Sequence, residues 1–152
     1  MIALLQRVSE ASVRVDGVVV GSIARGLLVF LGVGKGDAEA EVDRLAHRVA
    51  GYRCFPSEDG VRQMDASVQD IGGSILVVSQ FTLLADTKKG MRPGFDPAAL
   101  PEDAEPLYDR FSARLIEEGV GEVTTGRFGA RMQVALVNEG PVTLILEKRP
   151  AT

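Results

Sequence analysis

Two hydroxyl groups and a side-chain amide stand together in the stretch Ser79-Gln80-Phe81-Thr82. The aliphatic run at 74–78 precedes them and is typical of a buried central strand, so we expect these side chains where that strand reaches the surface. A hydroxyl there can act as a nucleophile, and backbone N–H groups there can stabilise a developing oxyanion. The alternative is that the side chains only satisfy hydrogen bonds at the end of the strand.

A second stretch, Asn138-Glu139-Gly140-Pro141-Val142-Thr143, lies between two apolar runs typical of strands, at 132–137 and 142–146, and we predict a turn there. Gly140 can adopt backbone angles that are closed to other residues, and the bond before Pro141 is of the one kind for which the cis form costs only about 0.5–1 kcal/mol. A backbone fixed in this way could hold its carbonyl groups against a ligand. An ordinary tight turn between strands has the same composition.

The only histidine, His47, is a poor candidate for a catalytic base because of its place in the sequence. The apolar spacing of residues 42–49 predicts a helix over 38–52 with one buried face. At about 100° per residue, His47 falls almost opposite that face and points to solvent. The hydroxyls of Ser79 and Thr82 therefore lack an evident activating base.

The sequence indicates neither a metal site nor a cofactor. The single cysteine, Cys54, excludes an internal disulfide, and one cysteine with one histidine cannot build a structural zinc site. The loop Gly34-Lys35-Gly36-Asp37 joins a predicted strand to the predicted helix, as phosphate-binding loops do, but its spacing matches neither the Walker motif nor the dinucleotide fingerprint. We expect Asp37 to be the N-cap of the helix instead.

Lys88, Lys89 and Arg92 form the densest cluster of positive charge, within a long irregular connection at 84–97. The formal net charge of -4 argues against a protein that coats nucleic acid without specificity, so contact with RNA would have to come from a local patch of this kind. The simpler interpretation of the cluster is a solvated surface turn.

The elements that position these residues make up one domain over 1–152. Asp16-Gly17 between two runs of valine predicts a type I′ hairpin. We expect strands at 2–8, 13–15, 18–20, 26–33, 74–78, 132–137 and 142–146, and helices at 38–52 and from 101 to a stop at 117–119. Met1 is followed by neither a secretory leader pattern nor a run long enough to span a bilayer, so a cytosolic protein is expected.

The stretches Ser79-Gln80-Phe81-Thr82-Leu83 and 138–143 together resemble the paired signatures of the D-aminoacyl-tRNA deacylases, in the widespread dimeric form of that enzyme. The resemblance extends over essentially the whole chain, in the following stretches: Gln6-Arg7-Val8, Ala11-Ser12-Val13, Gly72-Gly73, Gly90-Met91-Arg92-Pro93, and Gly126-Arg127-Phe128-Gly129-Ala130 with Met132. Three positions depart from the family pattern: Glu139 where Asp is frequent, Asp65 where Asn is expected, and Gly94 where Ser is common. If Asp65 lines the pocket, its carboxylate could alter the affinity for RNA or tune the substrate preference.

This resemblance implies an α+β fold: one compact domain with mixed and antiparallel β layers forming a barrel-like core, two main helices, and a homodimer with both sites at its interface. It implies that Gly140-Pro141 is cis and enters the pocket of the other subunit, where it faces residues 79–82. The catalytic group would be Ser79, Gln80, Phe81 and Thr82. The group that binds substrate and selects its chirality would be Arg7, Met132, Asn138, Gly140, Pro141 and Thr143.

The implied activity is hydrolysis of the ester bond of D-aminoacyl-tRNA, with glycine mischarged on tRNA as a further candidate substrate. Rejecting every L-aminoacyl-tRNA calls for rigid sterics rather than affinity for one side chain, and a Gly-Pro backbone provides them. Because no base is evident, we hypothesise that the substrate's own 2′-OH assists attack by water while N–H groups near Phe81 and Thr82 stabilise the oxyanion. Thr82 as a covalent nucleophile is the rival mechanism.

The basic residues acquire roles in this scheme. Arg7, inside the apolar run 2–8, is expected to hold the Gly-Pro stretch in place by bonding a backbone carbonyl. Lys88, Lys89 and Arg92 are expected to meet phosphates of the tRNA acceptor end. No DNA or membrane partner is expected.

Two other functions stay open. A dimeric RNA-binding scaffold without turnover would keep the same fold, but the intact residues of both signatures argue against it. A general esterase acting on small activated esters is disfavoured, because these residues assemble neither a catalytic triad nor a metal site.

Overall fold

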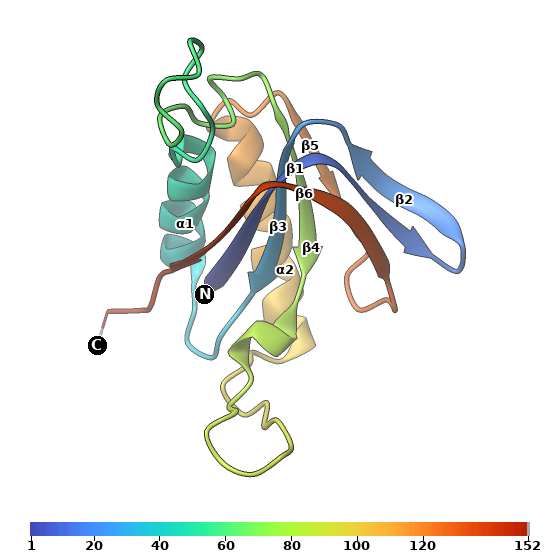
Figure 1. Ribbon diagram of the computed structural model, residues 1–152. Coiled ribbons are helices and arrows are strands. Elements are labelled where there is room, and N and C mark those ends of the chain that lie inside the picture. The colour runs from blue at the N-terminus through green and yellow to red at the C-terminus, as the bar shows by residue number, and fades with distance from the viewer. Residues whose placement is uncertain (152) are drawn as a thin grey trace.

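The computed structural model describes residues 1–151 as one mixed sheet with two α-helices and a short 3-10 helix (Figure 1). The strands are β1 (Ile2–Val15), β2 (Val18–Ile23), β3 (Gly26–Gly32), β4 (Ser74–Ser79), β5 (Glu122–Thr125) and β6 (Gln133–Glu147). The helices are α1 (Glu39–Gly51), α2 (Pro101–Glu117) and the 3-10 helix η1 (Phe81–Leu84). No helix in this part of the chain has both the length and the hydropathy that crossing a membrane requires.

The sheet has the order β2-β1-β3-β4-β5, and β6 pairs with β1 along the side opposite β2 and β3. β1 is antiparallel to β2, β3 and β6, whereas β3, β4 and β5 run parallel to one another. β2 packs back against β4 and β5, where a Cβ atom on Gly21 would lie 2.6 Å from the Thr125 carbonyl oxygen. The sheet is therefore nearly closed, which confirms the predicted α+β fold with a barrel-like core.

The β1–β2 hairpin confirms the prediction at its turn and corrects it along its first strand. Asp16 (φ 50°) and Gly17 (φ 78°) both lie in the left-handed region, as a type I′ turn requires. β1 is one continuous strand rather than two separate runs at 2–8 and 13–15, because β6 pairs with it over nearly its full length. The short strand β5 has no counterpart among the predicted strands, since four residues carry too little pattern to be recognised.

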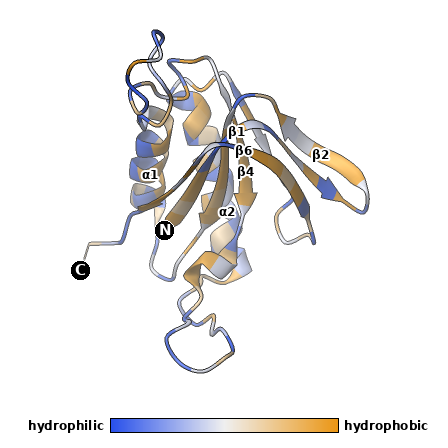
Figure 2. Cartoon of the chain, in the orientation of Figure 1, coloured by the Kyte–Doolittle hydropathy of each residue, from blue (hydrophilic) through white to orange (hydrophobic). Residues whose placement is uncertain are grey.

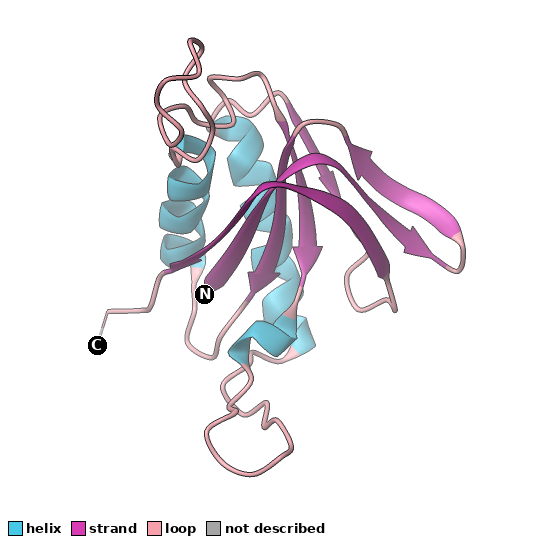
Figure 3. Cartoon of the chain, viewed as in Figure 1, coloured by secondary structure: helices cyan, strands magenta, loops and turns pink. Residues whose placement is uncertain are grey.

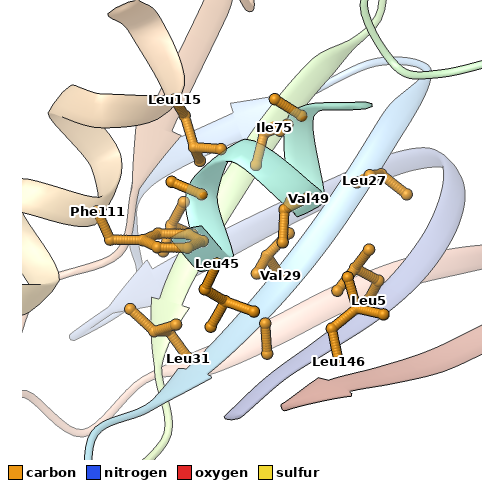
Figure 4. Close-up of a cluster of buried hydrophobic side chains, with 14 of the residues drawn as sticks. Leu5, Leu27, Val29, Leu31, Leu45, Val49, Ile75, Phe111, Leu115 and Leu146 are labelled. Carbon is orange, nitrogen blue, oxygen red and sulfur yellow. The ribbon is translucent and has the colours of Figure 1, made fainter. Parts of the chain in front are cut away.

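Both predicted helices are present and cover one face of the sheet (Figure 1). The main core lies between helices and sheet; in Figure 4, Leu45 of α1 and Phe111 of α2 meet Val29 and Leu31 of β3. The outward side of α1 is hydrophilic, whereas the strands are mostly hydrophobic (Figure 2). His47 lies on that outward side with 74% of its side chain exposed, as predicted.

A second, smaller core fills the inside of the barrel, on the face of the sheet away from the helices. It consists of buried aliphatic side chains from β1 to β4: Val8, Ala11, Val13, Ile23, Leu28, Leu76 and Val78. Met132 and Val134, at the start of β6, pack against this core while only partly buried. The core is therefore incompletely covered where β6 begins.

The prediction that Asp37 caps α1 is wrong. The N-cap is Ala38, whose N–H donates to the Glu41 carboxylate at 2.8 Å. Asp37 instead pairs with the α-amino group of Met1 at 2.7 Å and accepts a hydrogen bond from the Gly34 N–H at 2.7 Å. Both charged groups are almost fully buried, so the carboxylate serves as the counter-ion of a buried ammonium group rather than as a helix cap.

The close approach of β3 to β4 provides a test of the sheet. A Cβ atom on Gly26 would overlap the Ser74 carbonyl oxygen, which is part of the backbone and cannot turn away. We expect Gly26→Ala to lower the free energy of unfolding by about 1–3 kcal/mol or more, because two paired strands must separate. The measurement is urea unfolding followed by circular dichroism.

Gly51→Ala is the matched control, because no neighbouring atom lies within 4 Å of a Cβ atom at this last residue of α1. It should raise stability by up to about 1 kcal/mol, since alanine favours the helix. Equal stabilities of the two variants would contradict the close packing of β3 on β4.

Candidate functional site

The end of β4 carries the first predicted group of site residues. Ser79 is the last residue of β4, and the Gln80 N–H donates to the Leu31 carbonyl oxygen at 2.8 Å, which prolongs the pairing with β3. The chain then turns into η1 at Phe81. η1 packs against β3 at Gly32, where a Cβ atom would lie 3.1 Å from the Gln80 carbonyl oxygen, so glycine allows the turn to sit this close to the sheet.

Ser79, Gln80 and Phe81 line a cavity of about 530 Å³. Its other walls are apolar and come from five segments: the residue after β3, the end of β4, the chain leading into α2 with the first turn of α2, the 128–130 loop, and the chain that enters β6. The residues are Val33, Val78, Phe95, Ala98, Ala99, Leu100, Pro101, Ala104, Phe128, Gly129, Ala130, Met132 and Val134. None of these lining side chains is ionisable. A cavity of this size and character suits a small molecule or one end of a larger one.

Two aromatic rings stand at this cavity. Phe81 and Phe95 meet edge to face with 5.1 Å between their ring centroids. Both are exposed, Phe81 at 55% and Phe95 at 39%. Exposed aromatic side chains beside an apolar cavity mark a contact surface. Phe95 is absent from the predicted site. The only feature of the sequence that could have indicated a functional role for Phe95 is its position near the end of the long loop 84–97.

The hydroxyl groups at the end of β4 have no base beside them in the cavity. Thr82 does not line the cavity, and its hydroxyl accepts a hydrogen bond from the Gln80 side-chain amide. His47 is on the far side of α1 and bonds Glu118 at 2.9 Å. Ser79 does line the cavity, among residues that include neither a histidine nor a carboxylate.

Tyr108 of α2 connects two walls of the cavity and is missing from the predicted site. Its hydroxyl donates to the Val77 carbonyl oxygen at 2.9 Å, next to the end of β4, and its ring lies 5.7 Å from that of Phe128. Burial raises the pKa of the Tyr108 hydroxyl to about 12, so it stays protonated at neutral pH. In the sequence, Tyr108 is only one residue in the apolar stripe of a predicted helix. The available signal was its hydroxyl group, because a buried tyrosine hydroxyl usually has a hydrogen-bond partner.

The Gly-Pro stretch is not a turn between two strands, as predicted, but an interruption within the single strand β6 (Figure 3). β6 pairs with β1 at Thr143 opposite Gln6 and again at Asn138 opposite Val8. Residues 139–142 therefore bulge out of the ladder, which we call the Gly-Pro bulge. The two halves of β6 stay in one strand because the long partner β1 pairs with both.

Arg7 holds the Gly-Pro bulge by its backbone. Arg7 is 7% exposed, and its Nε–H donates to the Glu139 carbonyl oxygen at 3.1 Å while Nη1–H donates to the Cys54 carbonyl oxygen at 3.0 Å. At the apex, Gly140 has a φ of 121° and its peptide bond to Pro141 is cis. Glycine suits this position because L side chains rarely adopt such a φ, and because a Cβ atom would lie 2.6 Å from Nη2 of the buried Arg7.

Asn138 and Thr143 close the base of the Gly-Pro bulge. The Asn138 side-chain amide donates to the Thr143 hydroxyl at 3.0 Å, and the Val142 N–H donates to Asn138 Oδ1 at 3.3 Å. Gln6, for which the sequence indicates no separate role, donates to the same Thr143 hydroxyl at 3.2 Å. These bonds leave Gly140 exposed at the tip.

Of the predicted group that binds substrate and selects its chirality, the structure brings only Met132 to Ser79, Gln80 and Phe81 within one chain. No residue of 138–143 lines the cavity. Ser79 pairs with Leu31 and Leu31 with Ala3, whereas the bulge lies opposite Arg7, four residues further along β1. With three strand spacings across the sheet, the separation is on the order of 20 Å.

Lys88, Lys89 and Arg92 lie exposed on the loop between η1 and α2. Paired backbone hydrogen bonds between Asp86 and Gly94, at 2.7 and 2.9 Å, close this loop. The loop leads directly into Phe95 at the cavity, so its positive charges belong to the same region of the molecule.

Comparison with known proteins agrees with the resemblance in the sequence. The profile of the family described as D-Tyr-tRNA(Tyr) deacylase matches residues 4–147. A protein of Aeromonas hydrophila named D-aminoacyl-tRNA deacylase is 57% identical over 97% of this chain and 99% of its own. The protein of the same name from Alkalilimnicola ehrlichii is 56% identical over 99% of both chains.

Two solved structures share the fold. One is titled c-Myc DNA Unwinding Element Binding Protein; it has a TM-score of 0.93 and 38% identity and covers 99% of this chain and 100% of its own. The other, titled a probable eukaryotic D-amino acid tRNA deacylase, has a TM-score of 0.80 over 95% of this chain and 97% of its own, and at 20% identity it supports the fold alone. From the family profile and the relatives that match over nearly its full length, this chain belongs to the D-Tyr-tRNA(Tyr) deacylase family.

Proposed function

We propose that this protein hydrolyses the ester bond of D-aminoacyl-tRNA to a free D-amino acid and tRNA, and so proofreads chirality in the cytoplasm before translation. The observation that carries the proposal is the apolar cavity at the end of β4, lined by Ser79, Gln80 and Phe81, in a chain that matches the deacylase family from residue 4 to 147. The names of the relatives from Aeromonas hydrophila and Alkalilimnicola ehrlichii support the same activity.

The active form is a homodimer in which each subunit lends its Gly-Pro bulge to the cavity of the other. The separation of cavity and bulge within one chain supports this arrangement. So does the surface of β6, where Val137 is 49% and Ile145 is 65% exposed, and the mouth of the cavity, where Phe81 and Leu100 are each 55% exposed. These apolar side chains would be buried when two subunits associate.

The Gly-Pro bulge selects the chirality of the substrate through its backbone. With Gly140 and Pro141 at the cavity, main-chain carbonyl groups accept hydrogen bonds from the ammonium group of a D-aminoacyl ester. The backbone then occupies the space that an L side chain would need, whatever that side chain is. Glycine has no side chain to exclude, so glycyl-tRNA also fits this filter.

The chemistry requires little from side chains. Water attacks the ester carbonyl carbon, the vicinal 2′-OH of the terminal ribose helps to remove its proton, and the 3′ oxygen leaves with a proton as the ester bond breaks. Backbone N–H groups of Phe81 and Thr82, at the start of η1, stabilise the negative oxygen of the intermediate. The absence of ionisable side chains from the cavity lining supports this mechanism, and the use of a 2′-OH favours RNA over DNA as the partner.

The exposed cations of the loop after η1 bind the acceptor end of the tRNA. Lys88, Lys89 and Arg92 lie on a loop that ends at the cavity residue Phe95. An acidic protein has to attract a polyanion locally, and three cations within five residues do this.

One assay tests the function against its alternatives. The protein is incubated with D-Tyr-tRNA, with L-Tyr-tRNA and with a simple activated ester such as p-nitrophenyl acetate. We expect loss of the D-charged tRNA alone. Loss of the simple ester would favour a general esterase, and no loss of any substrate would favour a non-catalytic RNA-binding scaffold.

The mechanism predicts that removing the Thr82 hydroxyl is tolerated. Thr82→Ala should keep kcat for D-Tyr-tRNA within about tenfold of the parent enzyme, because the loss of one positioned group costs far less than the loss of a nucleophile. Single-turnover kinetics with folded protein, verified by circular dichroism, measures this. Complete loss of activity in a folded variant would refute this mechanism and favour Thr82 as a covalent nucleophile.

Arg7→Lys tests the link between the Gly-Pro bulge and chirality. Lysine keeps the charge but cannot bond two carbonyl groups in the planar geometry of a guanidinium. Losing one charged hydrogen bond of about 1.5–3 kcal/mol should lower kcat/KM for D-Tyr-tRNA by about ten- to hundredfold and reduce its preference over L-Tyr-tRNA. Arg14→Lys, at an exposed position of the same strand, should leave both values unchanged. An unaltered D/L preference in Arg7→Lys would refute the role of Arg7.

A further inference from the structure

A second cationic surface lies at the end of α1, away from the loop of Lys88 and Lys89. His47, Arg48, Gly51, Tyr52 and Arg53 surround a shallow hollow of about 460 Å³. The Arg48 guanidinium lies over the Tyr52 ring, 5.8 Å from its centroid. We call this the α1 hollow, and nothing in the proposed chemistry uses it.

The two arginines of the α1 hollow are not held in ion pairs by any described residue. Arg48 and Arg53 are exposed, and within residues 1–151 neither forms an ion pair. Arg53 donates to the Asp65 carbonyl oxygen at 2.7 Å, which fixes the guanidinium while leaving its charge in place. On α2 the opposite holds, since Arg110 and Arg114 each pair with carboxylates at 2.9 Å.

Three nearby carboxylates, those of Asp59, Asp65 and Asp70, are engaged by their own loops. Asp70 accepts a hydrogen bond from the Ser67 N–H at 2.9 Å, and its pKa is lowered mainly by its hydrogen bonds with Ser67 and less by the charge of Arg53. Asp59 accepts hydrogen bonds from the Ser57 hydroxyl and the Val61 N–H, at 2.6 and 3.0 Å. The Asp65 carboxylate pairs with Arg62 at 3.5 Å and does not line the active-site cavity of its own chain. The two arginines of the α1 hollow thus remain without an ion pair in the described part of the chain, in a protein of net charge -4.

The α1 hollow and the Gly-Pro bulge are linked through the Arg7 side chain. Arg7 bonds the Cys54 carbonyl oxygen at 3.0 Å and the Glu139 carbonyl oxygen at 3.1 Å, so the chain directly after Arg53 is tied to the bulge through a single buried side chain. If the Gly-Pro bulge enters the partner subunit's cavity in a dimer, the α1 hollow of the same chain therefore lies close to that cavity.

We propose that Arg48 and Arg53 bind RNA phosphates of the tRNA whose acceptor end occupies the cavity of the other subunit. The inference rests on the proposed function, because it requires the Gly-Pro bulge to reach the partner subunit's cavity. A guanidinium group binds phosphate well because its N–H donors form paired hydrogen bonds. The Tyr52 ring orients Arg48 and the Asp65 carbonyl group orients Arg53, so both side chains lose less entropy when they bind. The tRNA is then held from two sides, by the 88–92 loop of one subunit and the α1 hollow of the other.

The double variant Arg48→Gln/Arg53→Gln tests the contact. We expect kcat/KM for D-Tyr-tRNA to fall about tenfold at physiological salt, and the slope of its logarithm against log salt concentration to weaken by about 1.5, as losing two phosphate contacts implies. Hydrolysis of the D-tyrosyl ester of adenosine, which has no phosphate, should change less than twofold. Arg14→Gln/Arg149→Gln removes two exposed charges elsewhere and should leave both substrates unaffected.

Mixed dimers test which subunit provides the contact. Ala130→Trp fills the cavity and leaves one active site per mixed dimer. When the double variant and Ala130→Trp are in the same subunit, the remaining cavity faces the altered α1 hollow, and the tenfold loss should persist. When they are in different subunits, the remaining cavity faces a parental hollow, and activity should equal that of the Ala130→Trp mixed dimer alone.

The outcomes separate this inference from the function on which it rests. If the parent protein fails to hydrolyse D-Tyr-tRNA, the proposed function falls. If the parent is active but the double variant keeps its rate and salt dependence, only the phosphate contact is refuted. Equal losses on D-Tyr-tRNA and on the adenosine ester would also refute it, because they would indicate a disturbed cavity rather than a lost phosphate contact.

Discussion

Arg7 carries a permanent positive charge into the middle of β1, where only 7% of the residue is exposed. A buried guanidinium must have its N–H groups bonded, and the partners here are two backbone carbonyl groups from segments far apart in the sequence, at Cys54 and Glu139. Satisfying this one charge fixes how the end of α1, the centre of β1 and the bulge of β6 sit together. The buried Arg7 needs the Glu139 carbonyl group as a hydrogen-bond partner, and this bond helps to set the shape of the exposed Gly140-Pro141 backbone.

The features that local rules govern could be predicted from the sequence: the Asp16-Gly17 turn, both helices, the outward position of His47 and the polar end of β4. Features that depend on distant partners could not. β6 is one strand because the long strand β1 pairs with both of its halves. Asp37 does not cap α1 because its carboxylate pairs with the Met1 ammonium group. The lining of the cavity is likewise assembled from five segments, so Phe95 and Tyr108 gained significance only once those segments met.

In the proposed active site, two kinds of surface have different roles. One is an apolar hollow without ionisable side chains, and the other is a stretch of backbone with fixed carbonyl groups. In that proposal neither surface is complete alone, and the chain needs no set of acid, base and nucleophile side chains. Selectivity from backbone geometry, as proposed, would constrain residue type only at Gly140, Pro141 and the residues that hold them.

The Gly-Pro bulge has a second consequence, for the behaviour of the free sheet edge. Among the described strands β6 pairs only with β1, and a bare edge of this length can template further strands from neighbouring or unfolded chains. Pro141 has no N–H to offer, and Gly140, at a φ of 121°, leaves the extended conformation. The bulge therefore divides the edge into two short segments that cannot add strands in one register, which protects the protein from open-ended β-aggregation.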